Sequence, residues 1–572
     1  MKIINSKIKR SFVSKDLKIN KWGDIAPFFL ELKQSEIKSV KDLKKLLKDR
    51  SELEAILEEE VAWRYIKSTC DTKNKEIAES FEYFISEIEP EINKESNVLD
   101  KKIYKSEFLK KLDKDKYLIP IRNLKLKIEL FNEKNIPVIA ELQKLEQEYG
   151  VIAAAMTISY NNEEITLQKA ANYLKNNDRA QREEIYNLIN NRRLKDKTKL
   201  NDLLSVLIEK RTIIAKNSGY NNYRDYKHKE LARFDYTTED ILQFHESIKE
   251  TVVPLLEKIH TQRKKELNYK KLKPFDLDVD TKGKEAVIPF KNTDELIEKT
   301  IKLFSKIDSE FGNYIYTMKH LSYLDLEARI GKAPGGYNYP LYESNVPFIF
   351  MNSTNNLRDL ETMMHESGHA VHSFLSKDLE LIDFKSLPSE VAELASMSME
   401  LISMEYWDIF IKDKDELKRA KQSQLEGVIS VLPWVATVDK FQHWLYLNPK
   451  HNIEERENKW KEIFYEFSGN IIDFSSFEAF VANSWQKQLH IFEVPFYYIE
   501  YAISQLGAIA VWKNFKENKE LTIENYKKAL SLGYSKTIPE IYKTAGIKFS
   551  FEKKYIAELT SFVFNEYKKL KN

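Results

Sequence analysis

The chain has 572 residues, of which 42% are hydrophobic and 31% are charged. This composition is typical of a water-soluble globular protein. The length is too great for one simple core, so we expect at least two lobes. Lysine and arginine (91 residues) nearly balance aspartate and glutamate (89 residues). The net charge of +2 gives no electrostatic reason to expect nucleic acid or an anionic membrane as a partner.

Glycine (14 residues) and proline (15 residues) are scarce, since average usage would give about 40 glycines and about 29 prolines. So few helix breakers predict long helices. The single cysteine, Cys70, excludes an internal disulfide and favours a reducing compartment. The first 20 residues lack the apolar region of a signal peptide, and no run approaches the ~20 apolar residues of a membrane span. We therefore expect a cytoplasmic protein.

Residues 1–114 have the apolar spacing of helices joined by short connections. Within residues 53–61, for example, apolar side chains recur three or four positions apart. Ser51, with Glu54 three positions later, is expected to begin one of these helices as its N-cap.

The next stretch is punctuated by two prolines and one hairpin signal. Pro120 marks a boundary, and Pro137 predicts a break in the helical pattern that follows it. Residues 155–166 alternate apolar and polar side chains around Asn161-Asn162, which predicts a β-hairpin. Helical patterning then returns up to about Glu266.

The pattern is more broken over residues 268–292, and helical spacing resumes up to about Asp325. Residues 331–342 (GKAPGGYNYPLY) form the most loop-like segment of the chain. Residues 347–351 form a short apolar run suited to a strand. From Asn356 onward the pattern is mainly helix after helix.

A His-Glu-x-x-His motif begins at His365. On a helix, His365 and His369 project from one face a turn apart, so both imidazoles can bind one Zn²⁺ at about 2.0–2.1 Å. Glu366 can then reach a zinc-bound water, whose pKa falls to about 7, and take its proton. Asn356 as N-cap, with Asp359 three positions later, predicts the start of this helix.

Two histidines require a third protein ligand and an open position for water. A metzincin would have histidine at position 375, where this chain has Leu375, so that class is excluded. The candidates downstream are Glu380, Glu390, Glu393 and Glu400. Spacing alone does not decide between Glu390 and Glu393. On one helix Glu393 and Glu400 share a face, so one could bind the metal while the other supports it.

Other histidines have weaker patterns. The His-Glu-x-x-His motif itself would arise by chance in roughly one or two chains per hundred that contain ten histidines, as this one does. A second His-Glu pair, His245-Glu246, has no histidine at the required spacing, and we interpret it as ordinary surface. His372 lies seven residues after His365 on a similar side of the helix. It could contact substrate, support the metal site or serve as a packing residue.

The segments ETMMHESGHAVHSF (361–374) and SEVAELASMSME (389–400) resemble the oligoendopeptidase F and thimet oligopeptidase family of zinc metallopeptidases, and most closely its bacterial, Pz-peptidase-like branch. In that family the third zinc ligand is the glutamate of a V-A-E-like segment, which implies Glu393 here. One departure is Ser367, where the family often has a bulky apolar residue. The resemblance spans nearly the whole chain and includes residues 63–72, 332–337, 347–352 and 490–507.

The resemblance also implies histidine and tyrosine donors for the oxyanion that forms during amide hydrolysis. They fall on His490, Tyr498 and Tyr501, and a shift of one position would bring in Tyr497 instead. Core packing is the alternative role for this aromatic cluster.

Substrate contacts are expected from the loop and strand that precede the metal motif. A free edge on the 347–352 strand would let an extended peptide add to it through backbone hydrogen bonds. Gly335 and Gly336 would let the loop close over substrate, or would form a plain turn. We expect these glycines, Tyr337 and Phe350 to contact the peptide.

The predicted fold is mainly α, with a small β-sheet beside the metal-binding helix. The resemblance implies two helical lobes around a deep substrate channel. Residues 1–115 would form an N-terminal helical region. Residues 116–572 would form the catalytic region, with the zinc site around 356–400 and the substrate-binding segment around 490–507.

The predicted function is that of a zinc-dependent endopeptidase, with one Zn²⁺ per chain, that hydrolyses internal bonds of short unfolded oligopeptides. A zinc-bound water activated by Glu366 would attack the peptide bond, and the protein would be a monomer or a small homo-oligomer. A peptidyl-dipeptidase of the same fold and a non-catalytic helical peptide-binding protein are the alternatives.

Overall fold

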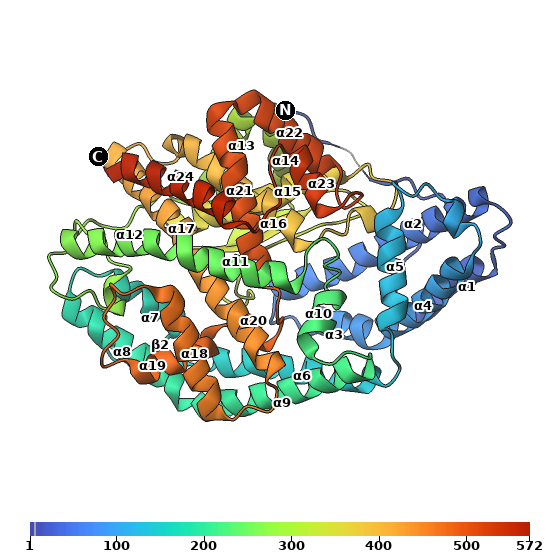
Figure 1. The fold of residues 1–572 in the computed structure, drawn as a ribbon. Coiled ribbons are helices and arrows are strands. Elements are labelled where there is room, and N and C mark those ends of the chain that lie inside the picture. Colours follow the sequence, from blue (N-terminus) through green and yellow to red (C-terminus); the bar gives the residue numbers. More distant parts are fainter. Residues whose placement is uncertain (5–6, 572) are drawn as a thin grey trace. The chain divides into compact units, whose positions relative to one another are not determined.

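The computed structural model describes residues 1–4 and 7–571 and separates into two compact units, each assembled from three stretches of chain. The first unit comprises Met1–Glu129, Val287–Lys421 and Ser504–Phe549. The second comprises Leu130–Ala286, Gln422–Ile503 and Ser550–Asn572. Both are mainly helical, which confirms the predicted fold class (Figure 1). The predicted division between residues 115 and 116 stays a prediction.

The first unit contains the helices that carry the metal motif and a small sheet. Its helices are α1 (Ala26–Gln34), α2 (Val40–Cys70), α3 (Lys75–Tyr83), α4 (Glu89–Lys105), α5 (Leu118–Leu130), α13 (Thr293–Ile307), α14 (Ser309–His320), α15 (Leu357–Ser376), α16 (Ser389–Ser403), α22 (Lys519–Ser531) and α23 (Ile538–Thr544). Its strands are β3 (Leu324–Glu327), β4 (Tyr337–Tyr339) and β5 (Phe348–Ser353).

The second unit is helical apart from one hairpin. Its elements are α6 (Asn135–Ala154), β1 (Thr157–Tyr160), β2 (Glu163–Thr166), α7 (Leu167–Ala171), α8 (Arg179–Lys195), α9 (Lys197–Asn217), α10 (Tyr223–Glu230), α11 (Thr238–Thr251), α12 (Val253–Glu266), α18 (Ile453–Ser468), α19 (Glu478–Ala482), α20 (Leu489–Phe492) and α24 (Lys553–Lys571). Helices α17 (Lys414–Leu447) and α21 (Ile499–Glu517) each begin in a stretch of one unit and end in a stretch of the other.

The long helix α2 packs with α1 around the N-terminal core of the first unit, and α1 packs in turn against α4 (Figure 1). The predicted helix start at Ser51 is wrong. The N-cap lies twelve residues earlier, where the Ser39 side chain accepts the N–H of Asp42. Ser51 lies inside α2, because the apolar stripe continues through it from Leu43 to Leu57. Its hydroxyl accepts the N–H of Ile382 at 2.7 Å instead.

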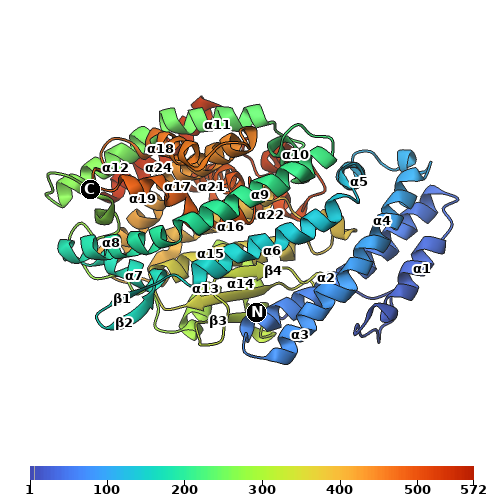
Figure 2. The same cartoon turned by 90° about the horizontal axis from the view of Figure 1, so that it is seen from below.

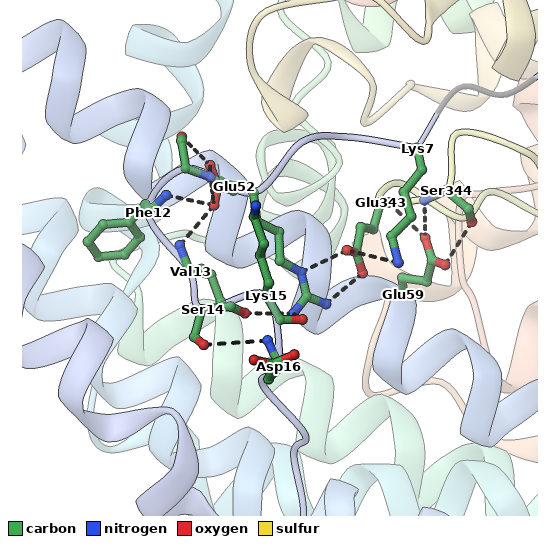
Figure 3. Close-up of polar contacts among 12 residues, drawn as sticks. Lys7, Phe12, Val13, Ser14, Lys15, Asp16, Glu52, Glu59, Glu343 and Ser344 are labelled. Atoms are coloured by element: carbon green, nitrogen blue, oxygen red, sulfur yellow. Dashed lines mark hydrogen bonds and ion pairs between the residues drawn. The ribbon is translucent and has the colours of Figure 1, made fainter.

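Two glutamates of α2 fix neighbouring segments of the first unit (Figure 3). Glu52 accepts the backbone N–H groups of Phe12 and Val13 at 2.9 and 2.8 Å. Glu59 accepts the backbone N–H groups of Glu343 and Ser344, both at 2.7 Å. The second set of contacts ties the connection that precedes β5 to the long helix, so the strand next to the metal motif has a fixed start.

The three-stranded sheet corrects one expectation about peptide binding. The apolar run at 347–351 does form a strand, β5, as predicted. However, β5 is the central strand: it pairs with β3 in parallel and with β4 in antiparallel fashion. The strand β5 is therefore not an edge strand, and the expectation of a free edge is wrong for Ile349 and Phe350, which pair on both sides. The sequence did not predict β3, because Leu324–Glu327 directly follows a segment with helical spacing.

The predicted hairpin is confirmed in the second unit. Strands β1 and β2 pair in antiparallel register, with Tyr160 opposite Glu163 (Figure 2). Asn161 and Asn162 form the two-residue turn with φ of 53° and 63°, the left-handed conformation that asparagine tolerates well. Pro137 occupies the first turn of α6, where a proline removes no intrahelical hydrogen bond.

Candidate active site

Helix α15 carries the metal motif, and its start is the predicted one. Asn356 accepts the N–H of Asp359, while the Asp359 side chain accepts the N–H of Asn356, which forms a reciprocal capping box. Leu360, Met364 and Val371 are fully buried on the apolar side of the helix. The remaining face presents His365 and His369, which are both partly exposed.

Helix α16 crosses α15 very closely at Gly368, the fourth residue of the motif. A Cβ atom at this position would lie 2.6 Å from Ser396 Cα and 2.8 Å from the carbonyl oxygen of Ala395. Such contacts do not occur between real atoms, so only glycine allows this crossing. Because Glu393 lies on α16 one turn before Ser396, the crossing brings its carboxylate to the histidines of α15.

Three side chains of these two helices converge on one point. His365 Nε2 lies 3.3 Å from Glu393 Oε2, and His369 Nε2 lies 3.6 Å from the same oxygen. The ligand atoms of all three residues lie within 4.8 Å of one another. A tetrahedral ion with bonds of about 2.0–2.1 Å would hold its ligand atoms about 3.3 Å apart. The donor set and its spacing therefore fit a zinc-sized cation.

Electrostatics at this point favour an anionic Glu393. Burial opposes its charge, but the two imidazoles outweigh burial and lower the pKa of Glu393 to about 2. Burial also opposes a charged His365, yet its hydrogen bonds to carboxylates raise the pKa of that imidazole. Burial lowers the pKa of His369 to about 4. Two imidazoles and one carboxylate in so small a volume form a natural ligand set for a divalent cation.

The other candidate glutamates have different surroundings. Glu400 Oε1 lies 2.7 Å from His365 Nδ1, the nitrogen on the far side of the ring from Glu393. Glu380 forms ion pairs with Lys48 and Lys116. Glu390 is 2% exposed and lies outside the metal-sized group. The structure thus separates Glu390 from Glu393, a choice that spacing alone leaves open.

Glu366 lies beside the first histidine of the motif and is 6% exposed. Burial raises the pKa of Glu366 to about 7, and the nearby carboxylates of Glu393 and Glu400 add to this increase. A bound divalent cation would act in the opposite direction and favour the charged carboxylate. The backbone at Glu366 is tied to the sheet, since Asn338 on β4 donates its side-chain N–H to the Glu366 carbonyl at 3.2 Å.

The glycine loop before β4 is anchored to β5. Asn352 donates to the carbonyl oxygens of Ala333 and Gly335 at 2.8 and 2.9 Å. Gly335 has φ of +101°, and a Cβ at Gly336 would lie 3.4 Å from the Phe350 carbonyl oxygen. These contacts favour a fixed turn that needs glycine for its conformation, rather than a lid.

Phe350 does not have the predicted surroundings. Its side chain is 0% exposed and stacks on Tyr337, with ring centroids 4.8 Å apart. It packs in a small core with Phe348 and Ile66, so its side chain supports the sheet and does not line an open surface. Tyr337 is partly exposed, and its contact with substrate stays a prediction.

In the second unit, a chain of hydrogen bonds fixes the state of His490. The Trp434 indole can only donate, and its Nε1 lies 3.2 Å from Gln488 Oε1. The Gln488 amide nitrogen must therefore face His490, and it lies 2.6 Å from His490 Nδ1. An amide N–H can only donate, so Nδ1 is the acceptor and the proton is on Nε2. Burial lowers the pKa of His490 to about 4, so the ring is a neutral Nε2–H donor near pH 7.

Tyrosines surround this histidine. The ring centroid of His490 lies 4.4 Å from that of Tyr498 and 6.0 Å from that of Tyr501. Tyr497 stacks parallel to His490 at 6.2 Å and contacts Tyr501 edge-on. The structure brings all three tyrosines to one histidine, so both registers considered from the sequence remain open.

The backbone between His490 and these tyrosines contains a strained residue that the sequence did not reveal. Phe496 has φ of +67°, a left-handed conformation that is rare for an aromatic residue. Arg233 donates to its carbonyl oxygen at 2.6 Å, and Gln442 accepts its N–H at 2.9 Å. Arg233 also pairs with Glu500 at 2.6 Å in the interior. These contacts come from distant stretches of chain, so no local pattern could predict them.

Two further histidines are buried. The interpretation of His245 as surface is wrong: it is 1% exposed, and its Nε2 lies 2.9 Å from Asp439. His245 lies four residues after the buried Ile241 and three before the buried Ile248, so it is on the apolar face of α11. His372 is also 1% exposed, which favours its packing role over contact with substrate.

Comparisons with known proteins show the family to which the chain belongs. The model of peptidase family M3 matches residues 172–561, and the model of the peptidase M3 N-terminal domain matches residues 17–131. The first match covers more than half of the chain. The chain therefore belongs to peptidase family M3, a family of metallopeptidases. This confirms the resemblance drawn from the two motif segments.

Individual relatives are distant but extensive. An oligoendopeptidase F homologue of Borreliella burgdorferi is 26% identical over 437 residues, which is 74% of this chain and 72% of that protein. The oligopeptidase PepF of Bacillus subtilis is 22% identical over 391 residues, 68% of this chain and 57% of that protein. The fold is similar to that of Pz peptidase A, with a TM-score of 0.88, 24% identity and 96% and 97% of the two chains covered.

Among the residues that the structure describes, no helix combines the length and apolar character needed to cross a bilayer.

Proposed function

We propose that this metallopeptidase is a zinc-dependent endopeptidase that cleaves internal bonds of short, unfolded oligopeptides. The observation that supports this most directly is the convergence of His365, His369 and Glu393 on one metal-sized point, with the Glu366 carboxyl on the same helix. The relatives named as oligoendopeptidases support the substrate class.

A Zn²⁺ ion held by these three residues would act as a Lewis acid, which lowers the pKa of bound water to about 7 and polarises a carbonyl. Glu366 is the residue of this chain that moves protons. Its carboxylate accepts a proton from the attacking water and gives it to the amine that leaves. Because Glu366 is nearly buried, few water molecules compete for its oxygens. Glu400 holds the His365 ring by accepting from Nδ1, which directs Nε2 toward the cation.

His490 and the tyrosines would stabilise the oxyanion that forms at the former carbonyl. The proton on Nε2 makes His490 a donor without any change of protonation at neutral pH. Preorganised donors of this kind contribute more than mobile water does, since they need no reorientation during the reaction. The family resemblance assigns this role to His490, Tyr498 and Tyr501.

The test is hydrolysis of a fluorescence-quenched peptide that is blocked at both ends. Wild-type protein should cleave it, and a chelator should abolish cleavage until Zn²⁺ is restored. Glu366→Gln should retain one Zn²⁺ per chain and lose nearly all turnover, because the amide cannot accept the proton. Full activity of a folded Glu366→Gln protein would exclude the proposed base. Release of dipeptides only, and only from unblocked peptides, would favour the peptidyl-dipeptidase alternative.

A further inference from the structure

The second unit contains a cavity of about 410 Å³ that the chemistry described above does not use. This volume lies in the range of small-ligand sites, about 300–1,000 Å³. It is lined mainly by α7, α8, α12, α17, α18 and the segment that precedes α20. Aromatic rings form much of the wall: Tyr186, Trp434, Phe464, Phe474 and Phe480.

Two cations also line this cavity, Arg193 near the end of α8 and Lys487 at the end of the 3₁₀ helix Ser484–Lys487. The other three arginines of α8 each form an ion pair with an aspartate. Within residues 1–4 and 7–571, neither Arg193 nor Lys487 has an ion-pair partner or a side-chain hydrogen bond. The only carboxylate in the lining is that of Asp278, which is exposed.

Lys487 shows the effect of a lining that has two cations and only one, exposed, carboxylate. Its Nζ lies 4.6 Å from the centre of the Trp434 ring, a cation–π contact. Lys487 is an exposed residue, although neighbouring protein atoms desolvate its ammonium. This burial and the charge of Arg193 lower the pKa of Lys487 to about 8. Cations with weak solvation and no partner are characteristic of sites that bind an anion.

The cavity wall is linked through one intervening residue to the proposed oxyanion donor, His490. Trp434 forms part of the wall, and its indole N–H donates to Gln488, whose amide donates to His490. Lys487 is also only three residues before His490 in the chain. Two successive hydrogen bonds therefore connect the cavity wall to His490 within the second unit.

We propose that the cavity is a subsite for the free C-terminal residue of a short peptide. Arg193 and Lys487 bind the terminal carboxylate, and the aromatic wall packs against an apolar side chain. A guanidinium can bind a carboxylate through two parallel hydrogen bonds, and the ammonium adds a point charge. The choice of a peptide as ligand rests on the proposed function, whereas the anion-binding chemistry of the cavity does not.

A binding measurement tests the cavity without any need for activity. Wild-type protein is titrated with N-acetyl-L-phenylalanine and, separately, with its uncharged amide, by isothermal calorimetry. The acid should bind at least tenfold more tightly than the amide. Lys487→Met and Arg193→Met should each weaken acid binding at least tenfold and leave the weak binding of the amide unchanged. Arg192→Met is the matched control, since Arg192 pairs with Asp196 outside the cavity and its loss should not alter binding.

A kinetic measurement tests whether the carboxylate that binds in the cavity is the C-terminus of a substrate peptide. Two quenched peptides of identical sequence, one with a free C-terminus and one amidated, are compared at constant pH. The free acid should have a KM about tenfold lower, and Lys487→Met should remove this difference, whereas Lys487→Arg should keep most of it.

Each outcome is decisive. Equal binding of the acid and the amide, or acid binding that survives both methionine variants, would overturn the anion subsite. Selective acid binding without any KM difference between the peptides would overturn the assignment to the substrate C-terminus. If the chain proves to lack endopeptidase activity, the calorimetric result still tests whether the cavity binds a carboxylate.

Discussion

His365 Nδ1 lies 2.7 Å from Glu400 Oε1, while Nε2 of the same ring faces Glu393. Because the carboxylate accepts at Nδ1, the proton of a neutral His365 must be on that nitrogen, and Nε2 is free to bind a cation. Glu400 is two turns beyond Glu393 on α16, so one helix supplies both the proposed third ligand and the partner that orients the first.

We expect Glu400→Ala to weaken Zn²⁺ affinity about 10–100-fold, since loss of such a partner lets the ligating ring rotate. Glu400→Gln should have a smaller effect, because an amide oxygen can still accept from Nδ1. Competition with a chromogenic zinc chelator measures both affinities. Unchanged affinity in Glu400→Ala would mean that the hydrogen bond does not orient the ring.

Glu393→Ala should release Zn²⁺ far more readily than Glu390→Ala. Glu393 lies 3.3 and 3.6 Å from the two imidazole nitrogens, whereas Glu390 lies outside their group. Metal content after dialysis against a weak chelator distinguishes the two variants, and the melting temperature checks that both remain folded. The opposite order of metal loss would show that the ligand has been assigned to the wrong glutamate.

Gly368→Ala should destabilise the first unit by about 1–3 kcal/mol and reduce its metal content, because the added methyl group meets the backbone of α16. Gly427→Ala is the matched control. A Cβ at this helical glycine meets no atom within 4 Å, so the change should stabilise the protein by up to about 1 kcal/mol. Thermal melts and zinc analysis of the two variants give the comparison. A Gly368→Ala protein as stable as wild type would contradict the close helix crossing.

Gln488→Glu should reverse the tautomer of His490. The new carboxylate still accepts from Trp434 but can no longer donate, so it draws the His490 proton to Nδ1. Loss of the Nε2–H donor should lower kcat about 10²–10³-fold with little change in KM. Nitrogen chemical shifts of the labelled ring report the tautomer independently of activity. Gln243→Glu, an exposed change on α11, should alter neither.

Stability should fall as the pH is lowered from about 6.5 to about 4, partly through His260. Burial, with a smaller effect of Arg263, lowers the pKa of His260 from 6.5 to about 4 in the folded chain. Between these values the unfolded chain binds a proton that the folded chain does not, so acid favours unfolding, by on the order of 2 kcal/mol for this residue. His260→Gln should have a smaller drop in melting temperature between pH 7 and pH 4.5. His320→Gln, at an exposed position, should behave like wild type.

Local sequence signals were sufficient to predict the helix that carries the two histidines. The capping box at Asn356 and the spacing of His365 and His369 depend only on residues close in sequence, as does the turn at Asn161. The start of α2 was misplaced because Ser39 and Ser51 both precede acidic residues, and only the continuous apolar stripe decides between them.

Features that depend on distant residues could not be predicted in this way. Strand β5 is central only because β3 pairs with its second edge, with Leu324 opposite Ile349, 25 residues later in the chain. The position of the proton on His490 depends on the hydrogen bond between Trp434 and Gln488, which are 54 residues apart in the chain. Arg233 holds Phe496 across 263 positions. The family resemblance supplied the identity of Glu393, which no spacing rule could choose.

The helix that bears Glu393 depends on the last segment of the first unit. The Tyr542 hydroxyl donates to the Glu390 carbonyl, the Tyr526 hydroxyl donates to that of Ala395, and Gly507 packs against Leu394. During synthesis on the ribosome, these partners emerge more than a hundred residues after the helix they hold. A nascent chain therefore lacks the contacts that support the metal-binding helix until nearly all of it has been translated. Incomplete chains would then have no proteolytic activity.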